Sequence, residues 1–452
     1  MPDTALQSAI RALMPRAHDD LAEMVAFRSV HDAAQFPPEE CERMAEWTAQ
    51  AFRELGFRDV ATHPTPDGSK AVCGHADGPP GAPTVLLYFH HDVQPPLDDA
   101  AWRTPVWQLT EVDGRWYGRG AADCKGNIAM HLTALRAFNG DYPVNLKIVG
   151  EDSEEQGTGG LEAFVPDNAD LLRPDTILVC DAGNFAVGVP SLTTSLRGLA
   201  NVVVEVQTLA SSMHSGMFGG AAPDALAALV HILATLRDEH GNTTVRGLDA
   251  TQTWQGADYP ADRFRTDATV LDGVDLLGDG RVSDLVWARP AVTVLGIDCP
   301  RVVGSSAAIQ PSARARLNLR VPPGTDAVEA RDALTRHLHD VAPWNVRIEV
   351  RPEAEGQPFT GSLTGPGFDA MTAAMKDVYG RDVTYQGQGG SIPLCNVFQD
   401  TFPDAEIMLI GVEEPRCLIH APTGSVDPSE IENMARVEAT FMQEYARRTP
   451  RT

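Results

Sequence analysis

The sequence predicts an α/β domain with a mainly parallel sheet and flanking helices, interrupted by a smaller inserted α+β domain. Short apolar runs of strand length alternate with helical segments towards both ends of the chain, a pattern typical of parallel sheets. In the middle, segments of strand and helix character follow in the order β-α-β-β-α-β, which is typical of a small α+β sandwich. A length of 452 residues also favours more than one domain.

The elements of the larger domain are predicted from apolar spacing. Met44, Trp47, Ala51 and Leu55 recur at helical intervals, and Gly56 follows as a stop signal, so a helix is expected over residues 39–55. Four apolar runs have the length of buried strands. These predicted strands are residues 84–89, 145–150, 175–180 and 406–411.

The character of the sequence changes near residue 198. Beyond it, strands are expected at 199–207, 291–297, 313–321 and 344–350, and helices at 222–238 and 326–342. Residues 245–288 show no clear period. We therefore expect a first domain made of residues 1–198 and 353–452, with a second domain, residues 199–352, inserted into it.

Composition narrows the class of protein. The formal net charge is −26, which makes nucleic acids and anionic membranes poor partners. No apolar stretch has the length of a membrane helix, and the N-terminus lacks the basic start and apolar core of a signal peptide. The seven cysteines are scattered without a CxxC pair, which favours free thiols in a reducing cytoplasm.

Residues able to bind metals follow the ends of the predicted strands. "HHDVQP" comes after the first strand, and the acidic stretch "EDSEEQGTGG" comes after the second. The glycine-rich turn "GRGAADCKG" lies between them. Because ligands bind beyond the carboxyl ends of strands in open α/β sheets, side chains distant in sequence are expected to converge there. They are His90, Asp123, Glu155, Asp181 and His420.

This donor set indicates a metal centre. Imidazole and carboxylate ligands suit zinc, and also manganese or cobalt. Five such ligands are too many for one catalytic zinc with an open position. They suit two divalent metals that share a bridging carboxylate, roughly 3.5–4 Å apart.

The chain resembles the dinuclear zinc amidohydrolase and exopeptidase family, which includes carnosine-type dipeptidases, glutamate carboxypeptidase, aminoacylase, acetylornithine deacetylase and succinyl-diaminopimelate desuccinylase. The resemblance rests on the stretches quoted above and on "VCDAG", "MHSGMFGG", "GGSIP" and "CLIHAP". It covers nearly the whole chain and is greatest to the dipeptidase branch. It implies a homodimer that cleaves dipeptides or short peptides. An N-acyl amino acid deacylase with the same metal centre is the alternative, and a non-catalytic binding protein is a remote one.

The resemblance also implies roles for the residues of the larger domain. His90 and Asp181 would complete one metal site, Glu155 and His420 the other, and Asp123 would bridge them. Glu154 would be the general base for the attacking water, and Asp92 would orient the His90 imidazole. A cis peptide bond is expected between Asp123 and Cys124.

The inserted domain would then be a lid and dimerisation domain that contributes to substrate binding. The resemblance implies that His214 stabilises the oxyanion across the dimer. Arg320 would hold the substrate carboxylate, because its planar fork binds carboxylates in a bidentate manner. Ser391 and backbone donors near Gly390 would lie beside the same carboxylate.

Overall fold

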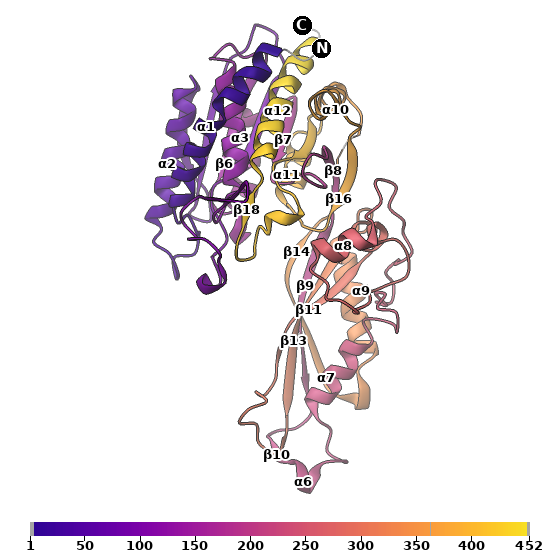
Figure 1. The fold of residues 1–452 in the computed structure, drawn as a ribbon. Helices are drawn as coiled ribbons and strands as arrows, with labels where there is room; N and C mark the ends of the chain where they lie inside the picture. Colours follow the sequence, from indigo (N-terminus) through magenta and orange to yellow (C-terminus); the bar gives the residue numbers. More distant parts are fainter. Residues whose placement is uncertain (1–3, 362, 450–452) are drawn as a thin grey trace. The chain divides into compact units, whose positions relative to one another are not determined.

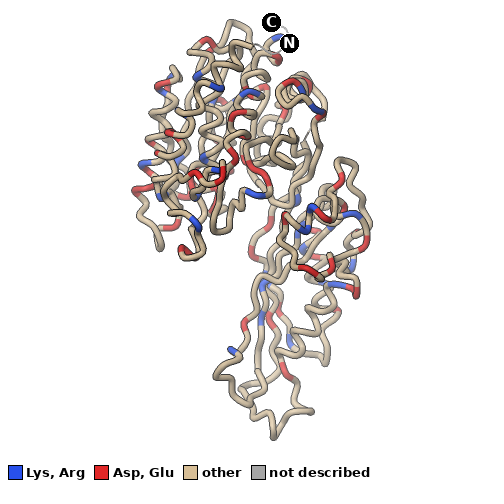
Figure 2. The backbone as a smooth tube through the Cα atoms, viewed as in Figure 1, with Lys and Arg blue, Asp and Glu red and all other residues tan. Residues whose placement is uncertain are grey.

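The computed structural model describes residues 4–361 and 363–449 and divides into two compact units (Figure 1). The first unit comprises residues 1–194, 361–386 and 394–452, and the second comprises 195–360 and 387–393. Asp and Glu alternate with Lys and Arg along both units, so the negative charge is not confined to one segment (Figure 2). In the described part of the chain, every helix is too short or too polar to cross a membrane.

The first unit is built on a mixed sheet. Its described strands run in the order β1-β2-β6-β3-β7-β17-β8, with the short strands β15 and β16 also paired to β8. The four central strands are β6 (Asn145–Glu151), β3 (Thr84–His90), β7 (Thr176–Cys180) and β17 (Glu406–Ile410), which pair in parallel. The predicted parallel sheet is therefore confirmed at its centre. Antiparallel strands extend it on both sides: β1 (Arg58–Pro64) and β2 (Lys70–Ala76) on one, and β8 (Ser191–Leu196) on the other. β8 also pairs with β16 (Thr384–Gln388) and, antiparallel, with β15 (Phe359–Thr360), which the division assigns to the second unit.

Helices from opposite ends of the chain pack against one another in this unit. α1 (Thr4–Ala26) and α12 (Pro428–Arg448) lie side by side with α3 (Lys125–Ala137), as Figure 1 shows in indigo, yellow and purple. The predicted helix at 39–55 is α2 (Glu39–Glu54), whose apolar face joins the same core. The remaining helices of eight or more residues described in this unit are α4 (Gly160–Asp167), α10 (Pro366–Tyr379) and α11 (Leu394–Thr401).

The second unit has the predicted β-α-β-β-α-β order. An antiparallel sheet runs β11-β13-β9-β14, and its apolar core is closed by α7 (Ala225–Ala234) and α9 (Ala327–Asp340). The strands are β9 (Gly198–Gln207), β11 (Ala291–Asp298), β13 (Ser312–Val321) and β14 (Arg347–Gly356). The stretch without a clear period contains the short helix α8 (Ala261–Asp267) and a π-helical turn at Asp284–Ala288. Contacts of Trp287 with Trp254 and Tyr259 hold it together.

A buried ion pair joins α3 to α12. His131 Nδ1 lies 2.7 Å from Glu438 Oε2, and neither side chain is exposed to solvent. We predict that Glu438→Ala lowers the free energy of unfolding by about 3–5 kcal/mol, because it leaves an imidazole buried without its partner. Urea denaturation measures this loss.

Glu432→Ala is the matched control on the same helix. Its partner Arg11, 3.0 Å away, is largely exposed, so this change should cost less than about 1 kcal/mol. Equal losses of unfolding free energy in the two variants would show that the buried pair stabilises this helix layer no more than the exposed pair does.

Candidate functional site

Seven of the predicted site residues lie at the carboxyl edge of the central strands of the first unit. His90 is the last residue of β3, and Asp181 directly follows β7. Asp123 lies in the turn that precedes α3, and the predicted cis bond to Cys124 is present there. Glu154 and Glu155 begin a short helical turn after β6, and His420 lies in the loop that follows β17. Parallel pairing of the strands places these segments together, with Asp92 beside them.

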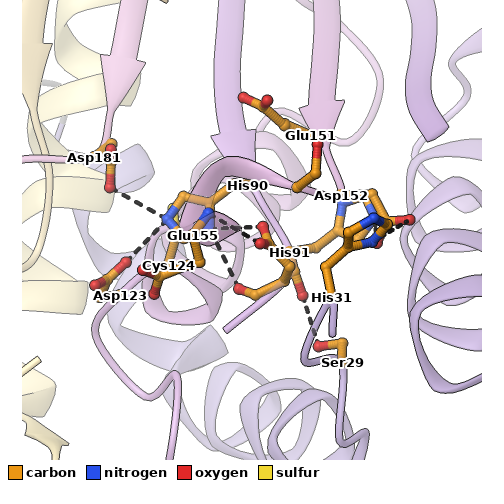
Figure 3. A network of polar contacts seen from close by, with 12 residues as sticks. Ser29, His31, His90, His91, Asp123, Cys124, Glu151, Asp152, Glu155 and Asp181 are labelled. Atoms are coloured by element: carbon orange, nitrogen blue, oxygen red, sulfur yellow. Dashed lines mark hydrogen bonds and ion pairs between the residues drawn. The ribbon is translucent and has the colours of Figure 1, made fainter. Parts of the chain in front are cut away.

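Asp123 lies between the two histidines and presents one carboxylate oxygen to each. His90 Nε2 is 2.9 Å from Asp123 Oδ1, and His420 Nε2 is 3.1 Å from Asp123 Oδ2. Figure 3 shows the His90 side of this arrangement. A carboxylate whose oxygens face opposite ways is the geometry that a bridging ligand requires.

Each histidine also has an acidic neighbour of its own. Asp181 Oδ1 lies 3.3 Å from His90 Nε2, and Glu155 Oε2 lies 3.2 Å from His420 Nε2. Ligand atoms of Asp123, Glu155 and His420 all lie within 4.8 Å of one another, as do those of Asp123, Asp181 and Glu413. The site is therefore two-sided, with one histidine and one outer carboxylate on each side of Asp123.

Mutual electrostatic effects dominate the ionisation of these groups. Burial lowers the pKa of His90, but the neighbouring Cys124, Asp181 and Asp123 outweigh it and leave the pKa well above its usual value. Hydrogen bonds to Asp123 and Glu155 raise the pKa of His420 to about 11. Burial raises the pKa of Glu155, with a further contribution from Asp123. Positive charge therefore stabilises the carboxylates, and a divalent cation provides more of it than a proton does. The imidazole and carboxylate donors fit such ions.

Asp92 and Gln94 connect the two sides of the site. Asp92 Oδ1 lies 3.3 Å from His90 Nδ1, while its Oδ2 accepts a 3.0 Å hydrogen bond from the Glu155 backbone N–H. Gln94 donates from its side chain to Glu155 Oε2 at 2.8 Å and from its backbone to Oε1 at 3.2 Å. The motif "HHDVQP" therefore orients a ligand on each side. Sequence reasoning missed Gln94, although it lies within the quoted motif.

Arg119 holds the loop that carries His420, and sequence reasoning missed it too. Its buried guanidinium donates to the backbone carbonyls of Ile419 and Ala421, on either side of His420, and to Pro95. Arg119 stands in "GRGAADCKG", and a charged residue inside a glycine-rich apolar segment is the signal that marks it.

Asp67, in the β1–β2 turn, holds the acidic loop on the other side. Its carboxylate accepts hydrogen bonds from the hydroxyls of Ser153 and Thr158, and from Thr65 and Ser69 in its own turn. No sequence pattern indicated this contact, because the partners are far apart along the chain.

Glu154 and Glu413 are further acidic groups in the same cluster. Burial and the Asp181 carboxylate raise the pKa of Glu154 well above its usual value. Burial and the Asp123 carboxylate do the same for Glu413, which was not predicted and lies close to Asp123 and Asp181. Cys124 also borders the site, and burial raises its thiol pKa to about 12.

The other predicted residues, His214, Arg320, Gly390 and Ser391, belong to the second unit. His214 ends the short strand β10 (Met213–His214) and is exposed. Its Nδ1 accepts a 3.1 Å hydrogen bond from the Gly216 N–H, so the ring proton is on Nε2. The side chain therefore presents an N–H donor.

A second arginine lies near Arg320. Arg197 directly precedes β9, and burial together with the charge of Arg320 lowers its pKa to about 10. The only hydrogen-bond partner of the Arg197 side chain found among the described residues is the Arg289 carbonyl, at 3.5 Å. The 389–393 loop packs against this guanidinium, because a Cβ at Gly389 would lie 2.7 Å from Arg197 Nη2. Ser391 Oγ is buried and has no hydrogen-bond partner among the described residues.

Comparisons with known proteins agree with this geometry. The sequence profile of peptidase family M20/M25/M40 matches residues 86–444. Cysteinylglycine-S-conjugate dipeptidase of Corynebacterium striatum is 43% identical over 438 residues, and the match covers 96% of each chain. Beta-Ala-His dipeptidase of Rattus norvegicus is 29% identical, and the match covers 91% of this chain and 86% of the relative.

The fold has solved counterparts. Human carnosine dipeptidase 1 superimposes with a TM-score of 0.84 and 25% identity, over 99% of this chain and 100% of the other. The dipeptidase Dug1p of Saccharomyces cerevisiae has the same TM-score at 22% identity, over 98% of each chain. With a family match across most of its length and a relative at 43% identity, the chain belongs to peptidase family M20/M25/M40.

Proposed function

We propose that this protein is a dinuclear-metal dipeptidase. The observation that carries the proposal is the position of Asp123, with one oxygen facing His90 and Asp181 and the other facing His420 and Glu155. These residues would hold two divalent cations per subunit, Zn²⁺ in the first place, with Mn²⁺ or Co²⁺ as substitutes. When bound, the cations supply Lewis-acid polarisation of the scissile carbonyl and lower the pKa of water.

Glu154 is proposed as the general base. It is half-buried beside the proposed ligands, and its raised pKa means that it holds a proton at higher pH than a free glutamate. Glu154 accepts the proton of the attacking water and delivers it to the leaving amine. Asp92 holds the His90 ring in place, and the Nε2–H of His214 donates to the oxyanion.

Arg320 is proposed to bind the C-terminal carboxylate of the substrate, and Arg197 to assist it. Two neighbouring, partly buried guanidiniums leave positive charge that an anion would neutralise. Ser391 and the backbone near Gly390 add hydrogen-bond donors. The names of the relatives, which are dipeptidases, favour dipeptides as substrates of this protein. The name of the Corynebacterium relative points to S-conjugates of cysteinylglycine in particular. An N-acyl amino acid also has a free carboxylate beside an amide, so deacylation stays the alternative.

The inserted domain that the sequence predicts over residues 199–352, which lies within the second unit, is proposed to act as lid and dimerisation domain. β11 is the last strand of its sheet, and Val294, Leu295 and Ile297 on it are exposed. Met217 and Phe218, close to His214 in sequence, are exposed as well. An apolar sheet edge of this kind supports pairing with a second copy. The buried free thiols support a reducing, cytoplasmic location.

The proposed function predicts which amides the metal-loaded protein cleaves. We expect hydrolysis of Cys-Gly, S-alkyl-Cys-Gly and β-Ala-His in preference to N-acetyl and N-succinyl amino acids. The release of free amine measures this hydrolysis. Glu154→Ala should lower kcat about 10²- to 10⁴-fold while the metal content stays unchanged.

The outcomes separate the three functional candidates. If only N-acyl amino acids are cleaved, the proposed function changes from dipeptidase to deacylase. If neither the dipeptides nor the N-acyl amino acids are cleaved while two metals are bound, the non-catalytic binding protein is favoured. Near-normal turnover by Glu154→Ala would remove Glu154 from the mechanism.

Arg320 is tested by changing one residue and one substrate group. We predict that Arg320→Ala lowers kcat/KM about 10- to 100-fold, since a charge-assisted hydrogen bond is lost. C-terminal amidation of the dipeptide should lower wild-type kcat/KM similarly, yet leave the variant nearly unaffected.

Arg316→Ala is the matched control, because Arg316 lies on the same strand and pairs with Glu353 on an exposed face. An Arg320→Ala enzyme that still discriminates between free and amidated substrates would place the carboxylate elsewhere.

The trans role of His214 is tested in mixed dimers. His214→Ala and Glu154→Ala homodimers should both be inactive. A purified hybrid carrying two different affinity tags should regain activity, because one of its sites is then intact if His214 of the partner subunit serves it. An inactive hybrid of verified composition would place His214 in the site of its own chain.

A further inference from the structure

A second group of metal-binding side chains lies in the first unit, beside the proposed dinuclear centre. It consists of His31, Cys41, Asp152 and His91 (Figure 3 labels all but Cys41). His31 lies in the loop after α1, Cys41 in the first turn of α2, His91 directly after β3 and Asp152 directly after β6. The proposed catalysis uses none of them.

The donor atoms of His31, Cys41 and Asp152 lie close enough together to share one metal ion, and His91 approaches Asp152. His91 Nε2 lies 3.4 Å from Asp152 Oδ1, and His31 Nδ1 lies 3.9 Å from Asp152 Oδ2. The ligand atoms of His31, Cys41 and Asp152 all lie within 4.8 Å of one another. Ligands at about 2.0–2.3 Å from a tetrahedral zinc are separated by about 3.3–3.8 Å, longer than a strong hydrogen bond.

Buried polar atoms in the group lack partners. Both ring nitrogens of His91 and the Oδ1 atom of Asp152 have no hydrogen-bond partner among the described residues. His91 is completely buried, and Asp152 and Cys41 are each 3% exposed. Burying such groups without partners destabilises a fold, so an arrangement that keeps several of them together points to a ligand.

Backbone contacts hold the segments in place. Ser29 Oγ donates to the His91 carbonyl at 2.8 Å, and Val93 N–H donates to the Ser29 carbonyl at 2.9 Å. The loop that carries His31 is thus tied to the segment that carries His91 (Figure 3). These hydrogen bonds hold the backbone near His31, while β3 and β6 hold the backbones of His91 and Asp152.

We propose that His31, Cys41 and Asp152, with His91 as fourth donor, form a mononuclear zinc site distinct from the dinuclear centre. One thiolate, two imidazoles and one carboxylate are donors that zinc accepts in tetrahedral sites. The ion cross-links α2 to the ends of β3 and β6. It therefore holds residues 90–92 and 151–155, from which the catalytic site is built.

Cys41 would have to lose its proton to bind a metal ion. Burial, and then the charges of Asp152 and Asp92, raise the pKa of its thiol far above the usual range. The thiol also lies within hydrogen-bonding reach of Asp152. A zinc ion displaces the thiol proton on binding and neutralises the surrounding carboxylates.

Zinc content tests the site without reference to turnover. Apoprotein is reloaded with Zn²⁺, freed of excess ion and analysed by inductively coupled plasma mass spectrometry. We expect Cys41→Ser and His31→Gln each to bind one zinc equivalent per chain fewer than wild type. Since only the difference is used, the result is independent of whether the dinuclear centre or its proposed activity is assigned correctly.

Co²⁺ loading identifies the ligand. A thiolate ligand produces sulfur-to-cobalt charge-transfer absorption in the near ultraviolet, which Cys41→Ser should remove. Cys73→Ser is the matched control, because Cys73 is a buried thiol in β2 whose pKa is raised by burial alone. It should retain both the absorption and the zinc count.

Two results would overturn the proposal. One is an equal zinc count in wild type and His31→Gln, whose partly exposed position makes a folding defect improbable. The other is near-ultraviolet absorption that survives Cys41→Ser.

Discussion

The architecture of the first unit depends on keeping an excess of negative charge together at one edge of a sheet. Asp123, Glu154, Glu155, Asp181 and Glu413 are gathered around two imidazoles, and most of them are shielded from water. Such a cluster is unstable unless cations compensate it. The surrounding structure therefore acts as a frame that prevents these groups from moving apart. Metal binding would offset the unfavourable free energy of holding their like charges together.

The frame is made of polar side chains that hold the loops carrying the candidate ligands. Arg119 grips the carbonyls on both sides of His420, and Gln94 fixes Glu155. Asp67 fastens the acidic loop through hydroxyl groups. Each contact joins a ligand loop to a segment that the sheet already fixes. The site is consequently rigid at the ligands' own backbones, which is where preorganisation is most effective.

The central strands were predictable because buried parallel strands appear in a sequence as uninterrupted apolar runs. The candidate ligands could be expected to lie together because they follow those runs. β1, β2 and β8 were not predicted, since their patterns are weaker and their pairing is set by neighbours far along the chain. Arg197, Arg119 and Glu413 were missed for a related reason. Their significance depends on what lies opposite them in space, and a single sequence does not state that.

β17 lies between β7 and β8 in the sheet, although more than two hundred residues separate it from either strand along the chain. The loop that follows β17 carries His420. During synthesis, the second unit emerges from the ribosome and can fold before the sheet of the first unit has its central strand. The proposed metal centre is therefore complete only after His420 has been synthesised, and a chain interrupted before that residue lacks one of its proposed ligands.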